Sequence, residues 1–219
     1  MSPSVEAVRP EGPPPRTRLG LHRSERLVLK LSALFGLDAF AGGFVVQGIV
    51  AYWFALRFGV PPAALGALFF GANLLAGLSA LAAARVAARL GLINTMVFTH
   101  LPSNFLLMLV PLMPNLPLAT LMLLARFSLS QMDVPPRQAY TLAVVAPDER
   151  AAAAGVTGVA RSVGSALSPA LAGAFLSHPN LLSAPFLIAG GLKILYDALL
   201  YRSFRAVAAQ TPCAPGSEK

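Results

Sequence analysis

The chain has 219 residues, of which 56% are hydrophobic and only 12% are charged. Average globular proteins carry about 25% charged residues, so this composition, with a mean hydropathy of +0.66, argues for a membrane protein. The net charge is +8, but the basic residues are spread singly between apolar runs. A nucleic-acid-binding face would instead gather them beside aromatic or polar readers, so we expect no nucleic-acid partner.

The first 30 residues are polar, basic and rich in proline. They contain no apolar stretch of the kind that a secretory signal peptide requires. We predict a cytoplasmic arm at 1–30, a membrane domain at 31–205 and a cytoplasmic tail at 206–219. The single cysteine, Cys213, permits neither an internal disulfide nor a cysteine-based zinc site.

Six apolar segments follow the arm, at about 31–56, 63–84, 92–112, 117–145, 152–176 and 184–201. A helix needs about 20 mostly apolar residues to span a bilayer, and most of these segments reach that length. The fourth is long and is interrupted by Pro135-Pro136. The segments lack the alternation of a membrane β-barrel, and the first three lack the polar stripe of a soluble bundle. We therefore expect an all-α membrane protein with six transmembrane helices.

Basic residues alternate from loop to loop. They precede the first segment and follow the second, fourth and sixth, whereas the intervening loops carry only Arg57. Since short loops rich in Lys and Arg stay in the cytoplasm, both termini are expected there. Four residues mark the internal cytoplasmic loops: Arg85, Arg89, Gly91 and Arg150.

Several polar side chains fall inside the predicted spans, where they are costly unless paired or hydrated. Six of them are candidates for a transport pathway or proton coupling: Asp38, Gln47, Arg126, Gln131, Asp133 and Arg161. For Asp38, a structural ion pair that locks helices together is an equal alternative. Asp133 and Arg137 are four residues apart and can pair along one helix face. Arg126 needs an acid, a carbonyl, water or a substrate, and Asp38 is a conceivable partner.

Two further pairs share this four-residue spacing, His100 with Asn104 and Lys193 with Asp197. For His100 a hydrogen bond is favoured over a proton-relay role, and for Lys193 a local ion pair with Asp197 is favoured. Small residues and one proline are expected to let helices pack closely or bend; they are Gly42, Gly43, Gly155, Gly158, Gly164, Pro169 and Gly173.

Enzyme signatures are missing from the sequence. It contains neither a His-Glu-x-x-His zinc motif nor a P-loop with its Gly-Lys-Ser/Thr ending. We therefore expect no enzymatic activity, no cofactor and no metal site.

The stretch 125–162 joins an Arg-containing polar helix to a Pro-Asp-Glu-Arg turn and a Gly-rich helix. It resembles the tenth helix, cytoplasmic turn and eleventh helix of the major facilitator superfamily, and residues 27–205 resemble the C-terminal six-helix half of such a transporter. Arg85-Val-Ala-Ala-Arg89-Leu-Gly91 stands where the family carries its basic cytoplasmic loop motif, with Ala84, Ala88 and Leu92 replacing a Gly, an Asp and a basic residue of that motif.

This resemblance implies a secondary transporter, or half of one, that moves a small solute across the lipid bilayer by alternating access. Proton-coupled efflux across the cytoplasmic (inner) membrane is the expected mode. Asp38 or Asp133 would then carry the proton, and Arg126 or Arg161 would be the counter-charge. A second six-helix half is expected from a missing N-terminal half, a separate chain or a second copy. The alternative is a structural or regulatory membrane subunit, or a truncated remnant.

Overall fold

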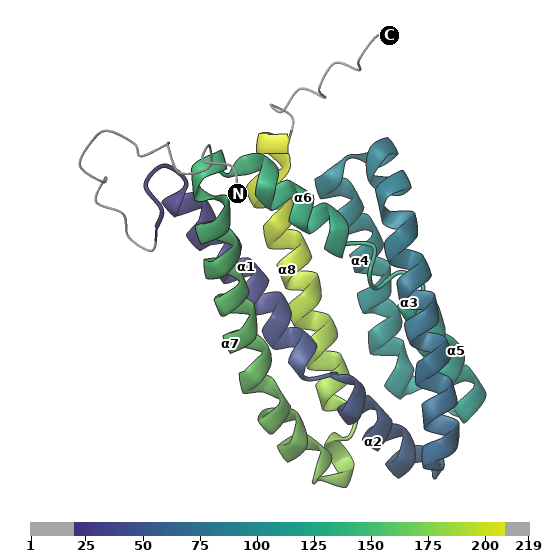
Figure 1. The fold of residues 1–219 in the computed structure, drawn as a ribbon. Coiled ribbons are helices and arrows are strands. Elements are labelled where there is room, and N and C mark those ends of the chain that lie inside the picture. The colour runs from purple at the N-terminus through teal and green to yellow at the C-terminus, as the bar shows by residue number, and fades with distance from the viewer. Residues whose placement is uncertain (1–19, 209–219) are drawn as a thin grey trace, which may run out of the picture.

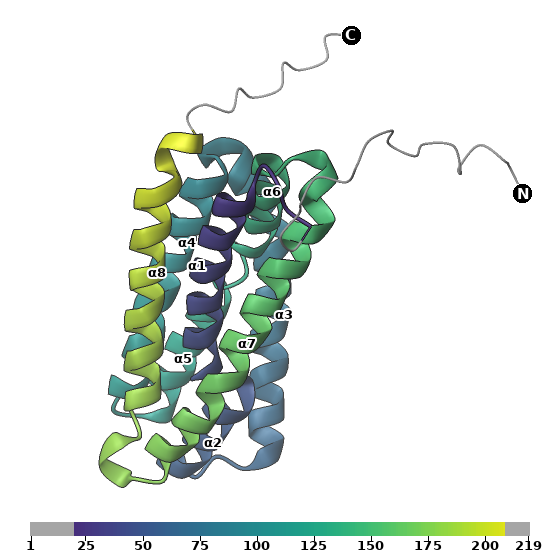
Figure 2. The same cartoon turned by 90° about the vertical axis from the view of Figure 1, so that its left-hand side faces the viewer.

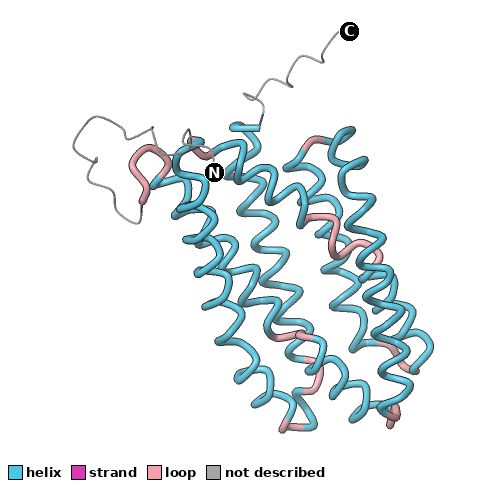
Figure 3. The backbone as a smooth tube through the Cα atoms, in the orientation of Figure 1, coloured by secondary structure: helices cyan, strands magenta, loops and turns pink. Residues whose placement is uncertain are grey.

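The computed structural model describes residues 20–208, and in that range the chain is built from helices and loops without strands (Figures 1 and 3). The long helices are α1 (Glu25–Gly43), α2 (Gln47–Phe58), α3 (Pro62–Leu90), α4 (Leu92–Leu109), α5 (Leu116–Phe127), α6 (Val134–Val144), α7 (Arg150–Leu176) and α8 (Ala184–Ala208). Short 3-10 turns lie at η2 (Val110–Leu112), η3 (Pro147–Glu149) and η4 (Pro179–Leu181).

Five helical segments within residues 20–208 are long and apolar enough to cross a membrane: Glu25–Phe58, Pro62–Leu90, Leu92–Leu112, Pro147–Leu176 and Pro179–Phe204. The prediction of an all-α protein with membrane-spanning helices is therefore confirmed. The prediction of six full-length spans is not. The fourth apolar segment is divided between α5, with 12 residues, and α6, with 11.

The division of the fourth segment has a local cause. Pro135 and Pro136 carry no amide hydrogen and cannot continue a helix that begins upstream, but they fit the first turn of a new one. The proline pair therefore fits the first turn of α6, which begins at Val134, whereas α5 has already ended at Phe127. The chain between them forms turns instead of helix.

The first segment is also interrupted. Helix α1 ends at Gly43, and residues 44–46 bend the chain before α2 begins at Gln47. The Gly42-Gly43 pair is a poor helix former, and Val46 has an extended backbone conformation. Helix α1 begins at Glu25, so the end of the predicted 1–30 arm is helical. Residues 1–19 of that arm and residues 209–219 of the predicted tail lie outside the described residues.

Figures 1 and 2 show α1, α7 and α8 as one group of helices beside a second group of α3, α4 and α5. Helix α7 packs along α1, and contacts between α4 and α8 join the two groups. The segment just before α1 is tied to the turn just before α7, because the Glu149 carboxylate accepts backbone N–H bonds from His22, Arg23 and Ser24.

Close packing of α1 on α7 depends on glycines. A Cβ at Gly164 would collide with the carbonyl oxygen of Gly36 and lie 3.1 Å from the Phe40 nitrogen. A Cβ at Gly43 would lie 2.9 Å from the Ser165 carbonyl oxygen and 3.3 Å from Cδ of Pro169. Absent side chains at these two positions allow the backbones to approach, as in other membrane helix pairs.

The remaining glycines of α7 do not take part in this packing. A Cβ at Gly155, Gly158 or Gly173 would meet no described atom within 4 Å. For these three residues, the expectation of close helix packing or bending stays a prediction. Pro169 lies inside α7, which runs without interruption from Arg150 to Leu176.

Two apolar clusters occupy opposite ends of the bundle core. One gathers around Trp53, Phe54 and Phe186, and the other around Phe35 and Tyr196. Along α1, α4 and α8, charged and polar residues lie in the sequence between members of the first cluster and members of the second. A polar layer therefore separates the two clusters.

Candidate functional site

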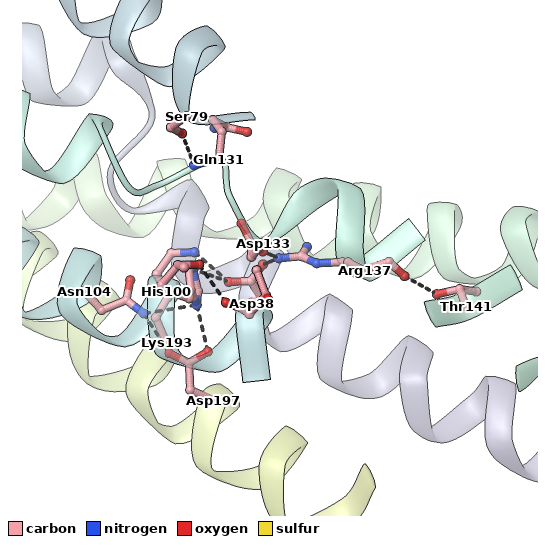
Figure 4. Close-up of polar contacts among 12 residues, drawn as sticks. Asp38, Ser79, His100, Asn104, Gln131, Asp133, Arg137, Thr141, Lys193 and Asp197 are labelled. Atoms are coloured by element: carbon pink, nitrogen blue, oxygen red, sulfur yellow. Dashed lines mark hydrogen bonds and ion pairs between the residues drawn. The ribbon is translucent and has the colours of Figure 1, made fainter. Parts of the chain in front are cut away.

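A network of buried ion pairs forms this polar layer (Figure 4). The Asp38 carboxylate on α1 lies 2.6 Å from Nζ of Lys193 on α8 and 3.1 Å from the Arg137 guanidinium on α6. Arg137 also pairs with Asp133, at the N-terminus of α6. All four side chains are buried, so each charge in this network is neutralised by a partner instead of by water.

His100 extends the network across α4. Its Nδ1 lies 2.8 Å from Oδ1 of Asp197, and the Asn104 amide donates a 3.0 Å bond to the other oxygen of Asp197. With an ionised Asp197, Nδ1 is the protonated nitrogen of the ring. The opposite nitrogen, Nε2, faces Asp38 at 3.8 Å. His100 thus connects a carboxylate on α8 with one on α1.

These side chains border a cavity of about 540 Å³. Both helix interruptions contribute to its lining, the first through Val45 and Val46 and the second through Ser130 and Gln131. Non-helical backbone within a membrane is tolerated where it is buried in protein or lines such a cavity, because polar groups there are not left against lipid. The two breaks in otherwise apolar segments therefore lie where their backbone groups face the cavity lining instead of lipid.

Arg126 on α5 and Arg161 on α7 line the same cavity. Within the described part of the chain, neither guanidinium forms an ion pair within 4.0 Å. The hypothetical partner of Arg126, Asp38, is paired with Lys193 and Arg137 instead. The Arg126 side chain lies against the ring of Phe127, at 5.2 Å, and its Nε atom is buried without a hydrogen-bond partner.

Gln47 and Gln131, the two glutamines proposed for the pathway, also line the cavity. The Gln47 side chain accepts a 3.2 Å bond from Asn73 on α3. The backbone N–H of Gln131 donates to the Ser79 hydroxyl at 3.3 Å, which ties the α5–α6 turn to α3. All six residues proposed from the sequence for the pathway therefore meet at one cavity.

The residues assigned to cytoplasmic loops lie elsewhere. Arg85 and Arg89 are exposed near the end of α3, and Gly91, with a φ of +83°, forms the short link to α4. Arg150 at the start of α7 donates from Nε to the Leu142 carbonyl oxygen at 3.0 Å. None of these four residues lines the cavity.

Gly42 has a different role from its neighbour Gly43. It lines the cavity, and a Cβ at this position would lie 3.8 Å from Nζ of Lys193. A small residue here leaves room for the Lys193 ammonium group to reach Asp38.

The sequence-based list of pathway candidates omitted three members of the network, although the predicted pairing of Asp133 with Arg137 is confirmed. Lys193 pairs with Asp38 and not with Asp197, so the predicted local ion pair is wrong. His100 and Arg137 were not among the pathway candidates, although both contact Asp38. One signal in the sequence could have identified them. Each is an ionisable side chain in an apolar segment, and such a side chain requires a partner.

The described residues contain no group of three or more His, Cys, Asp and Glu side chains placed to hold a metal ion.

Comparison with known proteins shows similarity to one membrane protein. The chain is 29% identical over 185 residues to a Saccharomyces cerevisiae protein described as "Uncharacterized membrane protein YJR124C". The match covers 84% of this chain and 41% of that protein, so the chain spans about two-fifths of its relative's length. No family model and no solved structure matches. The long apolar helices and this similarity together identify an all-α membrane protein.

Proposed function

We propose that the protein is a secondary transporter, or one six-helix half of a transporter, that moves a small solute by alternating access. The observation that carries the proposal is the meeting of two interrupted helices at one charged cavity inside the membrane domain. Secondary transporters characteristically place substrate and coupling-ion sites at interrupted helices near the middle of the membrane. The resemblance of residues 27–205 to the major facilitator superfamily supports the same reading.

Proton coupling is assigned to the paired carboxylates. A proton and a basic side chain compete for the same carboxylate, so a rearrangement that withdraws Lys193 from Asp38 leaves that carboxylate to take a proton. Asp133 stands in the same relation to Arg137. His100, between Asp38 and Asp197, supplies a third group that can bind or pass a proton.

A second six-helix half completes the pathway in this proposal, whether it is part of a longer chain, a separate chain or a second copy. The termini of the described chain and the basic loops are placed on the cytoplasmic side, because short loops rich in Lys and Arg remain there. The link between α3 and α4 lies at the same end of the bundle as the start of α1 (Figure 1), and Arg89 is in the last turn of α3 just before it, which supports this assignment.

The test is solute-driven proton movement in vesicles that contain the complete transporter, with both six-helix halves, and an internal pH-sensitive dye. Sugars, amino acids, organic anions and organic cations are added in turn. One class is expected to move protons with the wild-type chain. Asp38→Asn and Asp133→Asn should abolish coupling, whereas Arg57→Gln, at an exposed position in the last turn of α2, should retain it.

Two results would count against the proposal. The first is that no solute class moves protons in any vesicle preparation. The second is full coupled transport in both aspartate variants, which would remove the proton assignment. Melting temperatures measured on the same preparations separate loss of coupling from loss of folding.

A structural or regulatory subunit is the second candidate, and the neutralised ion pairs favour it. Pairs such as Asp38–Lys193 can hold helices together without any pathway. In that case substitutions at the pairs would lower stability in detergent, and no solute would move protons.

A further inference from the structure

We propose that the cavity binds a small organic anion, with a carboxylate or phosphate group held by Arg126 and Arg161. The inference rests on the proposed transport function, for which it names the substrate class. It follows from the charges that line the cavity and from which of them already have partners.

The cavity lining carries more positive than negative charge. Four basic side chains, Lys193, Arg126, Arg137 and Arg161, face two carboxylates, those of Asp38 and Asp133, which leaves a net charge of +2 with His100 neutral. Both carboxylates are already occupied, Asp38 by Lys193 and Arg137, and Asp133 by Arg137. A cationic ligand would find no free carboxylate here.

Arg126 and Arg161 hold the excess charge. A guanidinium has five N–H donors arranged in a fork that matches the oxygens of a carboxylate or phosphate. The Arg126 Nε is buried and has no acceptor in the described chain. A buried donor without a partner is costly, so the Arg126 side chain has hydrogen-bonding capacity that the described chain does not satisfy. Arg161 approaches the cavity from the other helix group, on α7.

The first turn of α2 adds to the positive potential. Val46 and Gln47, at the start of this 12-residue helix, line the cavity. The amide groups of a first helical turn have no partners within their own helix, and together with the helix dipole they favour negative charge. The start of α2 thus adds to the positive potential of the two arginines and forms part of the same site.

A neutral, hydroxyl-rich ligand is less well matched. The Ser130 and Ser165 hydroxyls donate to carbonyl oxygens of their own turns, those of Phe127 and Ser162. Arg126 and Arg161 are the charged donors at the cavity that have no carboxylate partner in the described chain. A volume of about 540 Å³ lies within the range of about 300–1,000 Å³ that small-molecule sites occupy.

An anionic group could reach the cavity from solution or from a phospholipid headgroup. The test is equilibrium binding of radiolabelled succinate and inorganic phosphate to the full chain in nanodiscs of zwitterionic lipid. Parallel nanodiscs contain anionic lipid, and radiolabelled putrescine serves as the cationic probe. At least one anion is expected to bind saturably in both lipid mixtures, while putrescine does not bind.

The variants locate the site. Arg126→Gln and Arg161→Gln should each weaken anion binding by about tenfold or more, because each removes a charge-assisted contact. Arg57→Gln, which removes an exposed arginine distant in sequence from the cavity lining, should leave binding unchanged. Melting temperatures of all variants are measured in the same nanodiscs.

Several outcomes would overturn the inference: saturable putrescine binding without anion binding, no binding of either anion, or anion binding that survives both arginine substitutions. If the anion no longer binds in nanodiscs that contain anionic lipid, a lipid headgroup occupies the cavity. That result would contradict binding of a soluble anion. Anion binding without solute-driven proton movement would support this inference and contradict the proposed function. Transport of sugars or cations with no anion binding would do the reverse.

Discussion

The two sides of the cavity treat charge differently. On the side built by α1, α4, α6 and α8, each charged group has an opposite partner, as in the Asp38–Lys193 pair at 2.6 Å. On the side built by α5 and α7, Arg126 and Arg161 have no carboxylate partner within the described chain. We call these the paired wall and the arginine wall.

This difference distinguishes charged residues that stabilise the fold from charged residues that are available to bind a ligand inside a membrane. Removing one member of a buried pair leaves the other exposed to a low-dielectric interior, so pairs are difficult to alter singly. An unpaired arginine carries its desolvation cost already, so its removal costs the fold little. Stability measurements on the two walls should therefore differ.

The largest effect is expected on the paired wall from Asp38→Asn. This change leaves Lys193 and Arg137 without one of their acceptors, and the free energy of unfolding should fall by about 3–5 kcal/mol. Unfolding in mixtures of detergent and sodium dodecyl sulfate measures it. The double variant Asp38→Asn with Lys193→Met removes both charges and should recover part of the loss. A loss below about 1 kcal/mol for the single variant would contradict a stabilising paired wall.

The next effect concerns the contact that holds α7, and with it Arg161, against α1. In Gly164→Ala the new methyl group meets the Gly36 backbone, which cannot move aside as a side chain would. We expect a loss of about 2–3 kcal/mol in the free energy of unfolding. Gly158→Ala is the matched control on the open face of α7, and alanine should be tolerated or gain up to about 1 kcal/mol there. Equal losses in both variants would show that α7 does not pack on α1 as described.

A smaller effect is expected at the edge of the paired wall from Asp197→Asn. The amide offers one acceptor oxygen where the carboxylate offers two, so either His100 or Asn104 loses its acceptor. The free energy of unfolding should fall by about 1–2 kcal/mol. The nearby exposed position Leu195→Ala is a control for general effects on α8. Unchanged NMR chemical shifts of the His100 ring would argue against its bond to Asp197.

The smallest change in stability is expected on the arginine wall. Arg126→Gln and Arg161→Gln break no ion pair, so the free energy of unfolding should change by less than about 1 kcal/mol in each case. The same unfolding assay applies, without added anion. A loss as large as that of Asp38→Asn would mean that an arginine has a structural partner, and the comparison between the walls would fail.

Much of the helical architecture follows from local sequence. The apolar segments at 63–84 and 152–176 lie within α3 and α7, since a long apolar stretch closed by glycine or proline turns has few alternatives to a membrane helix. The fourth segment shows the limit of that reasoning. Hydropathy records that its residues are apolar, but not that the backbone stops being helical between Phe127 and Val134.

Site residues were predictable as a class, but of the pairs they form only the local one, Asp133 with Arg137, was predictable. An acid or base inside an apolar segment is noticed at once because it is costly there, and Asp38, Arg126, Asp133 and Arg161 were identified in that way. The pairing of Asp38 with Lys193 was not predictable, because the two residues are 155 positions apart in the chain. The four-residue spacing of Lys193 and Asp197 indicated a local pair that does not form.

The sequence by itself determined that this chain is an all-helical membrane protein with charges buried in apolar segments, because composition and hydropathy depend only on which residues are present. Tertiary structure decided which charges neutralise each other and which remain unpaired. That outcome depends on helix packing, including the close approach at Gly164 and the two interruptions that open the cavity. The interaction energy of two charges decreases with the distance between them. The local sequence does not determine the distances between side chains on different helices.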